Sequence, residues 1–261
     1  MGGDGGSAGG RLAGKWALVT GSTRGLGRTI AEWLAREGAD IVVSGRNPDA
    51  VAASVAAIEA LGMRAIGIPA DLARPQEAHR LAREALARIG RLDILINNAG
   101  MSIRGPFWEV TDDDFAYQLN VNYRAPFILS QHLARHLLER GERGGRIVNI
   151  STIGAHSCHC DAAIYDSVKA GVEALTRNMA YELGPHGISV NCVIPGAIPE
   201  RPGGEGRAED SPAARVIPFG RAGRAADVAA AALFFCLPES AFTTGQSLLV
   251  DGAHRSYLHE Q

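Results

Sequence analysis

Short apolar runs alternate along the chain with longer stretches in which apolar residues recur every three or four positions. Continuous apolar runs are typical of strands buried on both faces of a parallel sheet, and the longer stretches are typical of helices that cover such a sheet. The seven runs are Ala17–Val19, Ile41–Val43, Ala65–Ile68, Ile94–Ile96, Ile147–Ile150, Val190–Ile194 and Leu248–Val250. The pattern therefore predicts an α/β fold, a doubly wound parallel sheet of about seven strands with helices on both faces.

Glycine and proline mark the ends of the predicted helices. We expect four glycines to end helices in the left-handed conformation, namely Gly38, Gly62, Gly90 and Gly184. Pro48 and Pro75 stand near two helix starts, where a fixed φ suits the first turn. Ligands of such a sheet bind at the carboxyl ends of the strands.

A chain of 261 residues of this pattern is expected to form a single domain over residues 11–261, after a disordered, glycine-rich tail over residues 1–10. Residues 199–212, dense in Gly, Glu and Arg, follow a predicted strand. They are a candidate substrate lid, although an ordinary surface loop is an equal alternative.

Charge and cysteine content favour small-molecule chemistry. The formal net charge is −2 with both signs interspersed, which gives no reason to expect nucleic acid or an acidic membrane as a partner. Neither a spanning apolar run nor a signal peptide is evident, so we expect a soluble, cytoplasmic protein. Four cysteines without a paired spacing fit a reducing compartment.

The first apolar run leads into a turn with Gly21, Gly25 and Gly27 and then into a helical stretch. Glycines let backbone N–H groups approach a ligand closely, and a helix N-terminus favours negative charge. This order predicts a site for a pyrophosphate. A glycine turn that only reverses the chain is the simpler alternative.

Tyr165 and Lys169 stand one helical turn apart, so their side chains share a helix face. A nearby ammonium stabilises a phenolate, and we therefore expect Lys169 to lower the pKa of Tyr165 toward neutrality. The pair would then exchange protons with a substrate. Tyr/Lys pairs also occur on solvated helices without any function, and only the place of this pair after the fifth run argues against that reading.

Four motifs together resemble the short-chain dehydrogenase/reductase superfamily. The motifs are Thr20-Gly21-x-x-x-Gly25-x-Gly27, Asn97-Asn98-Ala99-Gly100, Tyr165-x-x-x-Lys169 and Pro195-Gly196. The resemblance covers roughly Leu12 to Gly252 and implies a Rossmann-type sheet with a nicotinamide cofactor.

The resemblance also implies catalytic roles. Tyr165 would be the general acid or base, and Lys169 its partner and a ligand of the nicotinamide ribose. Asn122 matches the residue that holds a proton-relay water, with Asn120 as a competing choice and a structural role as the alternative. The family's serine, which bonds the substrate oxygen, stands thirteen residues before the tyrosine. Thr152 occupies this position, and it keeps the hydroxyl donor.

If the loop before Tyr165 were one residue longer than the family norm, Ser151 would take the place of Thr152. The tentative substrate pocket holds Ser102, Ser151, His159 and Cys160. His156, Cys158, His159 and Cys160 suggest zinc by residue type, but they lack the spacing of a zinc site, so no metal is expected.

The expected cofactor is NADP(H) rather than NAD(H). Gly45 has no carboxylate that would repel a 2′-phosphate, and Arg46 together with Arg24 could bind such a phosphate. Solvated surface arginines are the alternative. The family's threonine beside the nicotinamide is replaced by Glu200, which leaves the carboxamide contact open. The full cofactor set comprises Gly21, Thr23, Arg24, Gly25, Leu26, Gly27, Arg46, Asp71, Leu72, Asn98, Ala99, Gly100, Tyr165, Lys169, Pro195, Gly196 and Ile198.

The sequence thus predicts an NADPH-dependent oxidoreductase that reduces a ketone to a secondary alcohol. One alternative is an NAD(P)⁺-dependent secondary-alcohol dehydrogenase. Another is a non-catalytic NADP(H)-binding sensor or assembly subunit, since a fold does not dictate function. The resemblance implies a homo-oligomer, tetramer or dimer, and the substrate's identity stays open.

Overall fold

The structure of the chain is a computed structural model, and it describes residues 10–199 and 211–256. The expected N-terminal tail therefore lies outside the described residues except for Gly10. Most of the candidate lid over 199–212 lies outside them too, and so does Glu200. Residues 257–261 of the predicted domain lie outside them as well, and the rest of the domain is described.

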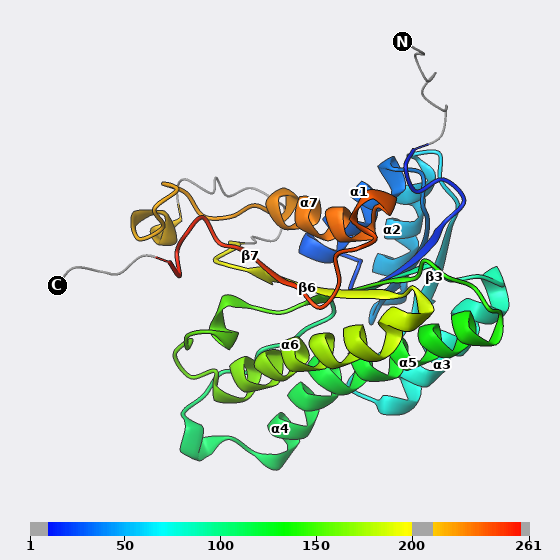
Figure 1. The fold of residues 1–261 in the computed structure, drawn as a ribbon. Helices are drawn as coiled ribbons and strands as arrows, with labels where there is room; N and C mark the ends of the chain where they lie inside the picture. Colours follow the sequence, from blue (N-terminus) through cyan, green and yellow to red (C-terminus); the bar gives the residue numbers. More distant parts are fainter. Residues whose placement is uncertain (1–9, 200–210, 257–261) are drawn as a thin grey trace, which may run out of the picture.

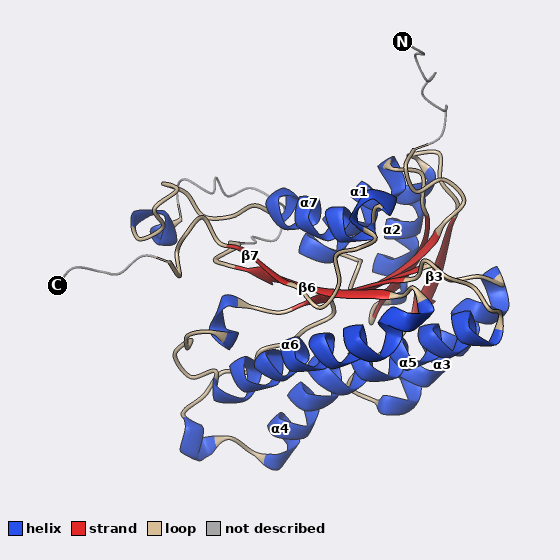
Figure 2. Cartoon of the chain, viewed as in Figure 1, coloured by secondary structure: helices blue, strands red, loops and turns tan. Residues whose placement is uncertain are grey.

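The described residues form one sheet of seven parallel strands in the order β3-β2-β1-β4-β5-β6-β7. The strands run across the middle of the molecule in Figure 2. All seven apolar runs fall in strands, which confirms the predicted strand pattern. The strands are β1 (Trp16–Thr20), β2 (Asp40–Gly45), β3 (Ala65–Pro69), β4 (Ile94–Asn97), β5 (Arg146–Ile150), β6 (Ser189–Pro195) and β7 (Ser247–Val250).

Helices connect these strands and cover both faces of the sheet. They are α1 (Gly25–Arg36), α2 (Pro48–Glu59), α3 (Pro75–Ile89), α4 (Asp112–Leu119), α5 (Ala125–Glu139), α6 (Ala163–Leu183) and α7 (Ala225–Cys236). A single π-helical turn, Asn120–Arg124, joins α4 to α5. In Figure 1, α1, α2 and α7 lie on one side of the sheet and α3, α4, α5 and α6 on the other.

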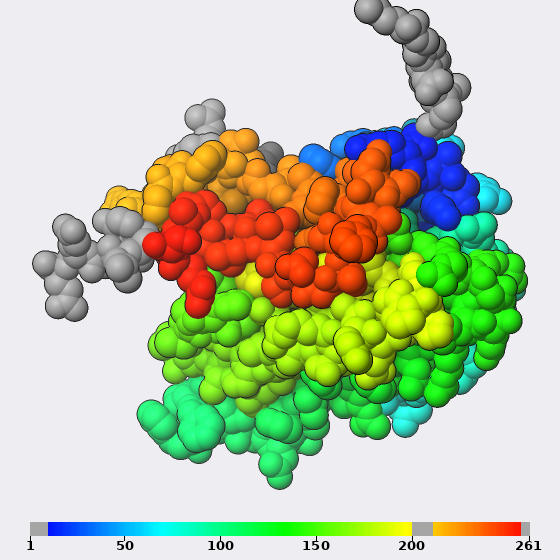
Figure 3. Space-filling model, in the orientation of Figure 1, coloured from blue at the N-terminus to red at the C-terminus, as the bar shows by residue number. Residues whose placement is uncertain are grey.

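Two separate hydrophobic cores fill the spaces between the sheet and its helices. Successive strand residues point to opposite faces, so Ala17 and Val19 of β1 join the core under α1 and α7, whereas Leu18 joins the core under α3 and α5. Figure 3 shows the orange residues of α7 beside the blue residues near the start of the chain. The first and last helices thus share one face of the sheet.

Local signals explain several helix ends. Asn47 caps α2, with its Oδ1 accepting from the Asp49 and Ala50 N–H groups at 2.8 and 3.2 Å, and Pro48 opens the helix. Pro75 likewise opens α3. Three of the four predicted glycines have the expected positive φ, at Gly38, Gly62 and Gly90.

The prediction for Gly184 is wrong. Its φ is −54°, because α6 runs on into a short 3-10 turn, Gly184–His186. Gly187 ends that turn with a φ of 73° and takes the left-handed position instead. The chain therefore leaves the helix three residues later than the sequence suggests.

The strand order reverses at β1, which lies between β2 and β4. At such a switch point the loops on neighbouring strands separate and leave a crevice at their carboxyl ends. The residues that the motifs contribute follow β1, β2, β4, β5 and β6 at this edge. Among the described residues, the longest and most apolar helices fall short of what a membrane crossing requires.

Candidate active site

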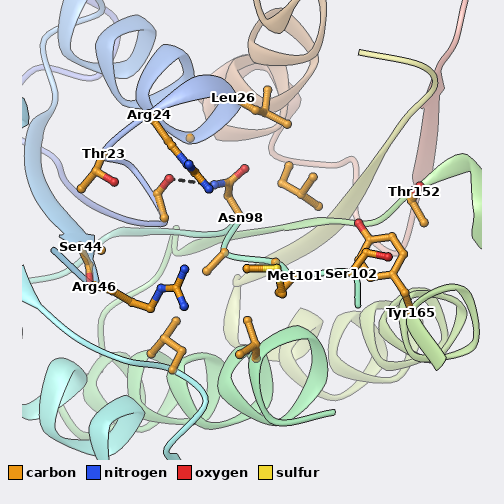
Figure 4. Close-up of a pocket in the computed structure, with 18 of the residues that line it drawn as sticks. Thr23, Arg24, Leu26, Ser44, Arg46, Asn98, Met101, Ser102, Thr152 and Tyr165 are labelled. Carbon is orange, nitrogen blue, oxygen red and sulfur yellow. Dashed lines mark hydrogen bonds between the residues drawn. The ribbon is translucent and has the colours of Figure 1, made fainter. Parts of the chain in front are cut away.

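A cavity of about 660 Å³ opens at the carboxyl ends of the strands. It collects most of the predicted site: of that set, the cavity walls contain Gly21, Thr23, Arg24, Leu26, Gly27, Arg46, Asp71, Leu72, Asn98, Ala99, Gly100, Ser102, Ser151, Thr152, Tyr165, Lys169, Pro195, Gly196 and Ile198. Gly25, Asn122, His159 and Cys160 are not among the wall residues. In Figure 4, Arg24 and Arg46 lie at one end of the cavity and Thr152 and Tyr165 at the other.

The glycine turn forms one wall and leads directly into α1. Gly21 and Gly25 have φ values of 65° and 51°, which side chains larger than hydrogen rarely tolerate. Asn98 fixes the turn from the neighbouring loop, since its Nδ2 donates to the Thr20 carbonyl oxygen at 2.9 Å. Helix α1 begins without a side-chain cap and without an acidic residue in its first turn. This helix end therefore suits a phosphate ligand.

Two arginines line the same end of the cavity. Arg46 donates from Nη1 to the Tyr117 hydroxyl at 3.0 Å, which links the end of β2 to α4. Gly45 packs so closely on Thr23 that a Cβ there would stand 2.6 Å from Thr23 Cγ2. A carboxylate side chain could therefore not occupy position 45 without displacing Thr23. This end of the cavity therefore carries two arginines, and position 45 lacks an acidic residue of the kind that bonds a free ribose 2′-hydroxyl.

Lys169 is buried, and its Nζ donates to the Ile150 carbonyl oxygen at the end of β5, at 2.7 Å. Burial lowers its pKa from 10.5 to about 8, because the charged form loses hydration. Its Nζ lies 5.8 Å from the centroid of the Tyr165 ring. The strand thus fixes the ammonium beside the phenol, as the helical spacing predicted.

Tyr165 corrects one expectation. Its pKa is raised rather than lowered, mainly by burial and further by the Asp166 carboxylate, with Arg104 opposing the rise. The expected effect of Lys169 is absent from these contributions. Desolvation of the phenolate is the largest contribution. Tyr165 is therefore a protonated phenol at neutral pH in this state.

The two candidates for the substrate hydroxyl, Thr152 and Ser151, differ in what they already bond. Ser151 donates to Glu173 Oε1 at 2.8 Å, so its proton is committed to a buried carboxylate. Thr152 accepts a long bond of 3.4 Å from the Gly154 N–H, which leaves its hydroxyl proton available. Figure 4 shows Thr152 next to Tyr165. The geometry therefore favours Thr152 over Ser151.

Asn122 lies in the π-helical turn, fully buried, and serves the backbone. Its Nδ2 donates to the carbonyl oxygens of Met101 and Gln118, both at 2.8 Å, and its Oδ1 accepts from the Met101 N–H at 3.1 Å. These bonds hold the loop after β4 against α4. π-Turns of this kind are frequent at functional sites. The competing Asn120 bonds the Ala73 carbonyl oxygen instead.

Comparison with known proteins identifies the family. The family model described as Enoyl-(Acyl carrier protein) reductase matches residues 21–253. The hydroxynaphthalene reductase-like protein Arp2 of Metarhizium majus is 36% identical over 257 residues, covering 92% of this chain and 95% of the relative. The chain belongs to the short-chain dehydrogenase/reductase superfamily.

Solved structures of short-chain dehydrogenases/reductases agree in fold. Acetoin dehydrogenase from Enterobacter cloacae superposes with a TM-score of 0.88 at 36% identity, covering 95% of this chain and 98% of that one. A blue fluorescent protein from a metagenomic library, solved in complex with NADPH, superposes with a TM-score of 0.84 at 35% identity. The match covers 94% of this chain and 99% of that one. This short-chain dehydrogenase/reductase is thus an oxidoreductase of alcohol and ketone groups, in a family that binds a nicotinamide cofactor.

Further polar residues of this short-chain dehydrogenase/reductase were not predicted. Tyr117 lines the cavity from α4, where no local motif marks it. Glu173 accepts from Ser151 and pairs with His156 Nε2 at 2.8 Å. Only tertiary structure brings Glu173 to Ser151 and His156, since Glu173 lies on α6 and the other two residues follow β5. His156 was considered from its residue type, but its carboxylate partner has no signal in the sequence.

His159 and Cys160 do not line the cavity, contrary to the expected substrate pocket. His159 Nδ1 lies 2.9 Å from Asp166 Oδ1, so this ring nitrogen is already paired. Cys160 is exposed and donates to Asp161 Oδ2 at 3.3 Å. Within the described ranges, groups of three or more His, Cys, Asp or Glu arranged for a metal are absent.

Proposed function

We propose that this protein reduces a ketone to a secondary alcohol with NADPH. The observation that carries the proposal is a single cavity whose one end holds Thr152, Tyr165 and Lys169 and whose other end holds the glycine turn with two arginines. A proton donor and a dinucleotide site at opposite ends of one cavity suit hydride transfer. The nicotinamide, when bound, supplies the hydride.

Tyr165 would deliver the proton to the carbonyl oxygen of the substrate. Thr152 would donate a second hydrogen bond to the same oxygen and stabilise the charge that develops on it. Because burial keeps the Tyr165 phenol protonated, the cofactor-free site already stands in the state that reduction requires. Alcohol oxidation over the same groups would start from the phenolate, so the two directions differ in the protonation state of Tyr165 that they require.

Lys169 and Asn122 would support the proton donor. Lys169, fixed by the Ile150 carbonyl oxygen, would hold the nicotinamide ribose and stabilise the phenolate left after proton transfer. The side-chain amide of Asn122 already bonds backbone groups of the loop after β4. Asn122 would therefore contribute to the proton relay by holding this loop in position.

NADPH is proposed over NADH on three grounds. Arg24 and Arg46 line the adenosine end, and guanidinium groups bind phosphate well. Gly45 packs on Thr23, which excludes a carboxylate at the end of β2. A structural neighbour at 35% identity was solved in complex with NADPH.

We also propose a cytoplasmic homo-oligomer, dimer or tetramer. Phe115 on α4 and Phe127 on α5 are 50% and 44% exposed, and half-exposed aromatic residues of this kind are enriched at subunit interfaces. The exposed free thiols of Cys158 and Cys160 suit a reducing compartment.

The proposed chemistry is tested by NADPH consumption with a panel of ketones. We expect Tyr165→Phe to lower kcat by at least about 100-fold, because general acid catalysis contributes about that much, while the NADPH dissociation constant stays within a factor of about three. The matched control is Tyr181→Phe, at a tyrosine that is 87% exposed on the same helix. Full turnover by Tyr165→Phe would refute the proton-donor role, and NADPH binding without any turnover would favour a sensor.

A further inference from the structure

The loop that leaves β4 passes the catalytic end of the cavity on a fixed backbone. The Ile103 N–H donates to Gln118 Oε1 at 3.1 Å, and the Gly105 N–H donates to the Asp161 carbonyl oxygen at 3.0 Å. The first bond ties the loop to α4 and the second ties it to the segment before α6. The backbone that follows Ser102 is therefore fixed between α4 and the segment before α6.

Ser102 carries a polar atom that the protein itself does not satisfy. Its Oγ is buried and has no hydrogen-bond partner among the described residues. The residue lines the cavity, and Figure 4 shows it beside Tyr165 and near Thr152. A buried hydroxyl without a partner is costly, so a ligand that bonds it gains affinity. Thr152 and Tyr165 would take the ketone oxygen, which leaves Ser102 for a second oxygen of the same substrate.

Arg104 stands two residues further on, between the two backbone anchors. Its side chain is exposed, and it forms no ion pair within residues 10–199 and 211–256. The positive charge of its guanidinium opposes the rise of the Tyr165 pKa. It also opposes the rise of the Cys160 thiol pKa. The catalytic phenol thus has an unpaired positive charge beside it.

The carboxylates of Asp166 and Asp161, which act together with Arg104 on the pKa values of Tyr165 and Cys160, are already engaged. Asp166 accepts from the His159 N–H at 2.7 Å and pairs with the His159 ring. Asp161 accepts from the Cys160 thiol. Arg104 is therefore available to an anionic ligand. A single guanidinium matches one negative charge and forms two parallel bonds with a carboxylate, whereas a phosphate monoester carries up to two charges.

We propose that the substrate is an oxo carboxylic acid, with its carboxylate bound by Arg104 and an oxygen near its ketone bonded by Ser102. The proposal rests on the ketone reduction proposed above and names the substrate class of that site. Arg104 would also offset the repulsion between the bound anion and the nearby Asp166. A neutral ketone without a second oxygen would leave the Ser102 hydroxyl without a partner and the Arg104 guanidinium in contact with solvent alone.

The test compares acids with their neutral esters. Purified full-length protein and NADPH are assayed with pyruvate, acetoacetate and levulinate and with the methyl ester of each. We expect kcat/KM to favour at least one acid over its ester by about tenfold or more. Arg104→Met should lower kcat/KM for that acid by about 10- to 100-fold and change kcat/KM for the ester much less, since a charge-assisted bond to the carboxylate is lost. The kcat/KM of Arg104→Lys for the acid should lie between those of the wild type and Arg104→Met.

Ser102→Ala should lower kcat/KM for the acid by about tenfold, again without loss of NADPH binding. Arg83→Met, at an exposed arginine on α3, is the matched control. Preference for every ester over its acid, or an equal loss on acid and ester in Arg104→Met, would overturn the proposal.

A separate measurement distinguishes failure of this proposal from failure of the reductase itself. If no ketone is turned over, calorimetry measures binding of the three acids to the protein saturated with NADP⁺. Tighter binding to the wild type than to Arg104→Met would support the carboxylate site without reduction. Equal or undetectable binding would overturn it.

Discussion

Buried ionisable side chains make the stability of the protein depend on pH. The pKa of Lys169 falls to about 8 and those of Cys192 and Cys236 rise to about 12, in each case mainly through burial. The buried lysine and the two buried cysteines change the stability of the folded protein in opposite directions as the pH rises. Between pH 8 and 10.5 the unfolded chain keeps a proton on Lys169 that the folded chain releases, so stability rises with pH. Above pH 9 the unfolded thiols ionise first, so stability falls.

Lys169→Met isolates the lysine contribution. A shift from 10.5 to about 8 corresponds to about 3 kcal/mol that opposes folding below pH 8 and is relieved as pH rises to 10.5. We expect the difference in unfolding free energy between wild type and variant to move by about this amount between pH 7 and 10, in urea denaturation of the cofactor-free protein. Lys15→Met, at the other lysine of the chain, is the matched control. A difference that is constant over this range would contradict the burial of a charged Lys169.

At the scale of elements, the sequence predicts strands better than it predicts the connections between them. Apolar runs identify β1 to β7 because strands buried on both faces must be apolar along their whole length. The predicted helix end at Gly184 is wrong because a glycine can continue a helix as well as end one. Local sequence also marks the glycine turn and the Tyr165/Lys169 pair, since each motif lies within a single element and its neighbouring loop.

Motifs that lie within one element do not predict which residues of different elements contact each other. Helix α6 holds the preceding loop through Glu173 and Asp166, which pair with His156 and His159. Glu173 also accepts from Ser151, the residue before Thr152. These partners are separated by seven to twenty-two positions and meet only after the helix packs on the sheet. The helix that carries Tyr165 thereby also fixes the loop that carries Thr152.

Glu173→Ala should loosen this loop. The change leaves the Ser151 hydroxyl and the His156 ring without their shared acceptor, which we expect to cost about 2–3 kcal/mol of unfolding free energy. Amide hydrogen exchange over residues 151–164 should also accelerate relative to the strands. Glu182→Ala, at an exposed position near the end of the same helix, is the control. Wild-type stability and exchange in Glu173→Ala would show that the carboxylate does not hold the loop.

At the scale of the whole molecule, the proposed site joins the two halves of the sheet. The glycine turn and Arg46 follow β1 and β2, whereas Thr152, Lys169 and Pro195 follow or end β5 and β6. Strand β1 pairs directly with β4, so no boundary divides the sheet between these halves. A ligand that spans the cavity should therefore stabilise both halves at once.

This continuity predicts one cooperative thermal transition that NADPH shifts as a whole. At 100 times its dissociation constant, a ligand that binds only the native state adds about 2.7 kcal/mol, which for a chain of this size is about 5–10 °C in Tm. Arg46→Ala should reduce the shift by NADPH and leave that by NADH unchanged, because only NADPH carries the 2′-phosphate. Arg36→Ala, at the far end of α1, is the control. Two separate transitions would show that the halves unfold independently despite the shared sheet, and an equal loss with both dinucleotides would place Arg46 on a part of the cofactor that they have in common.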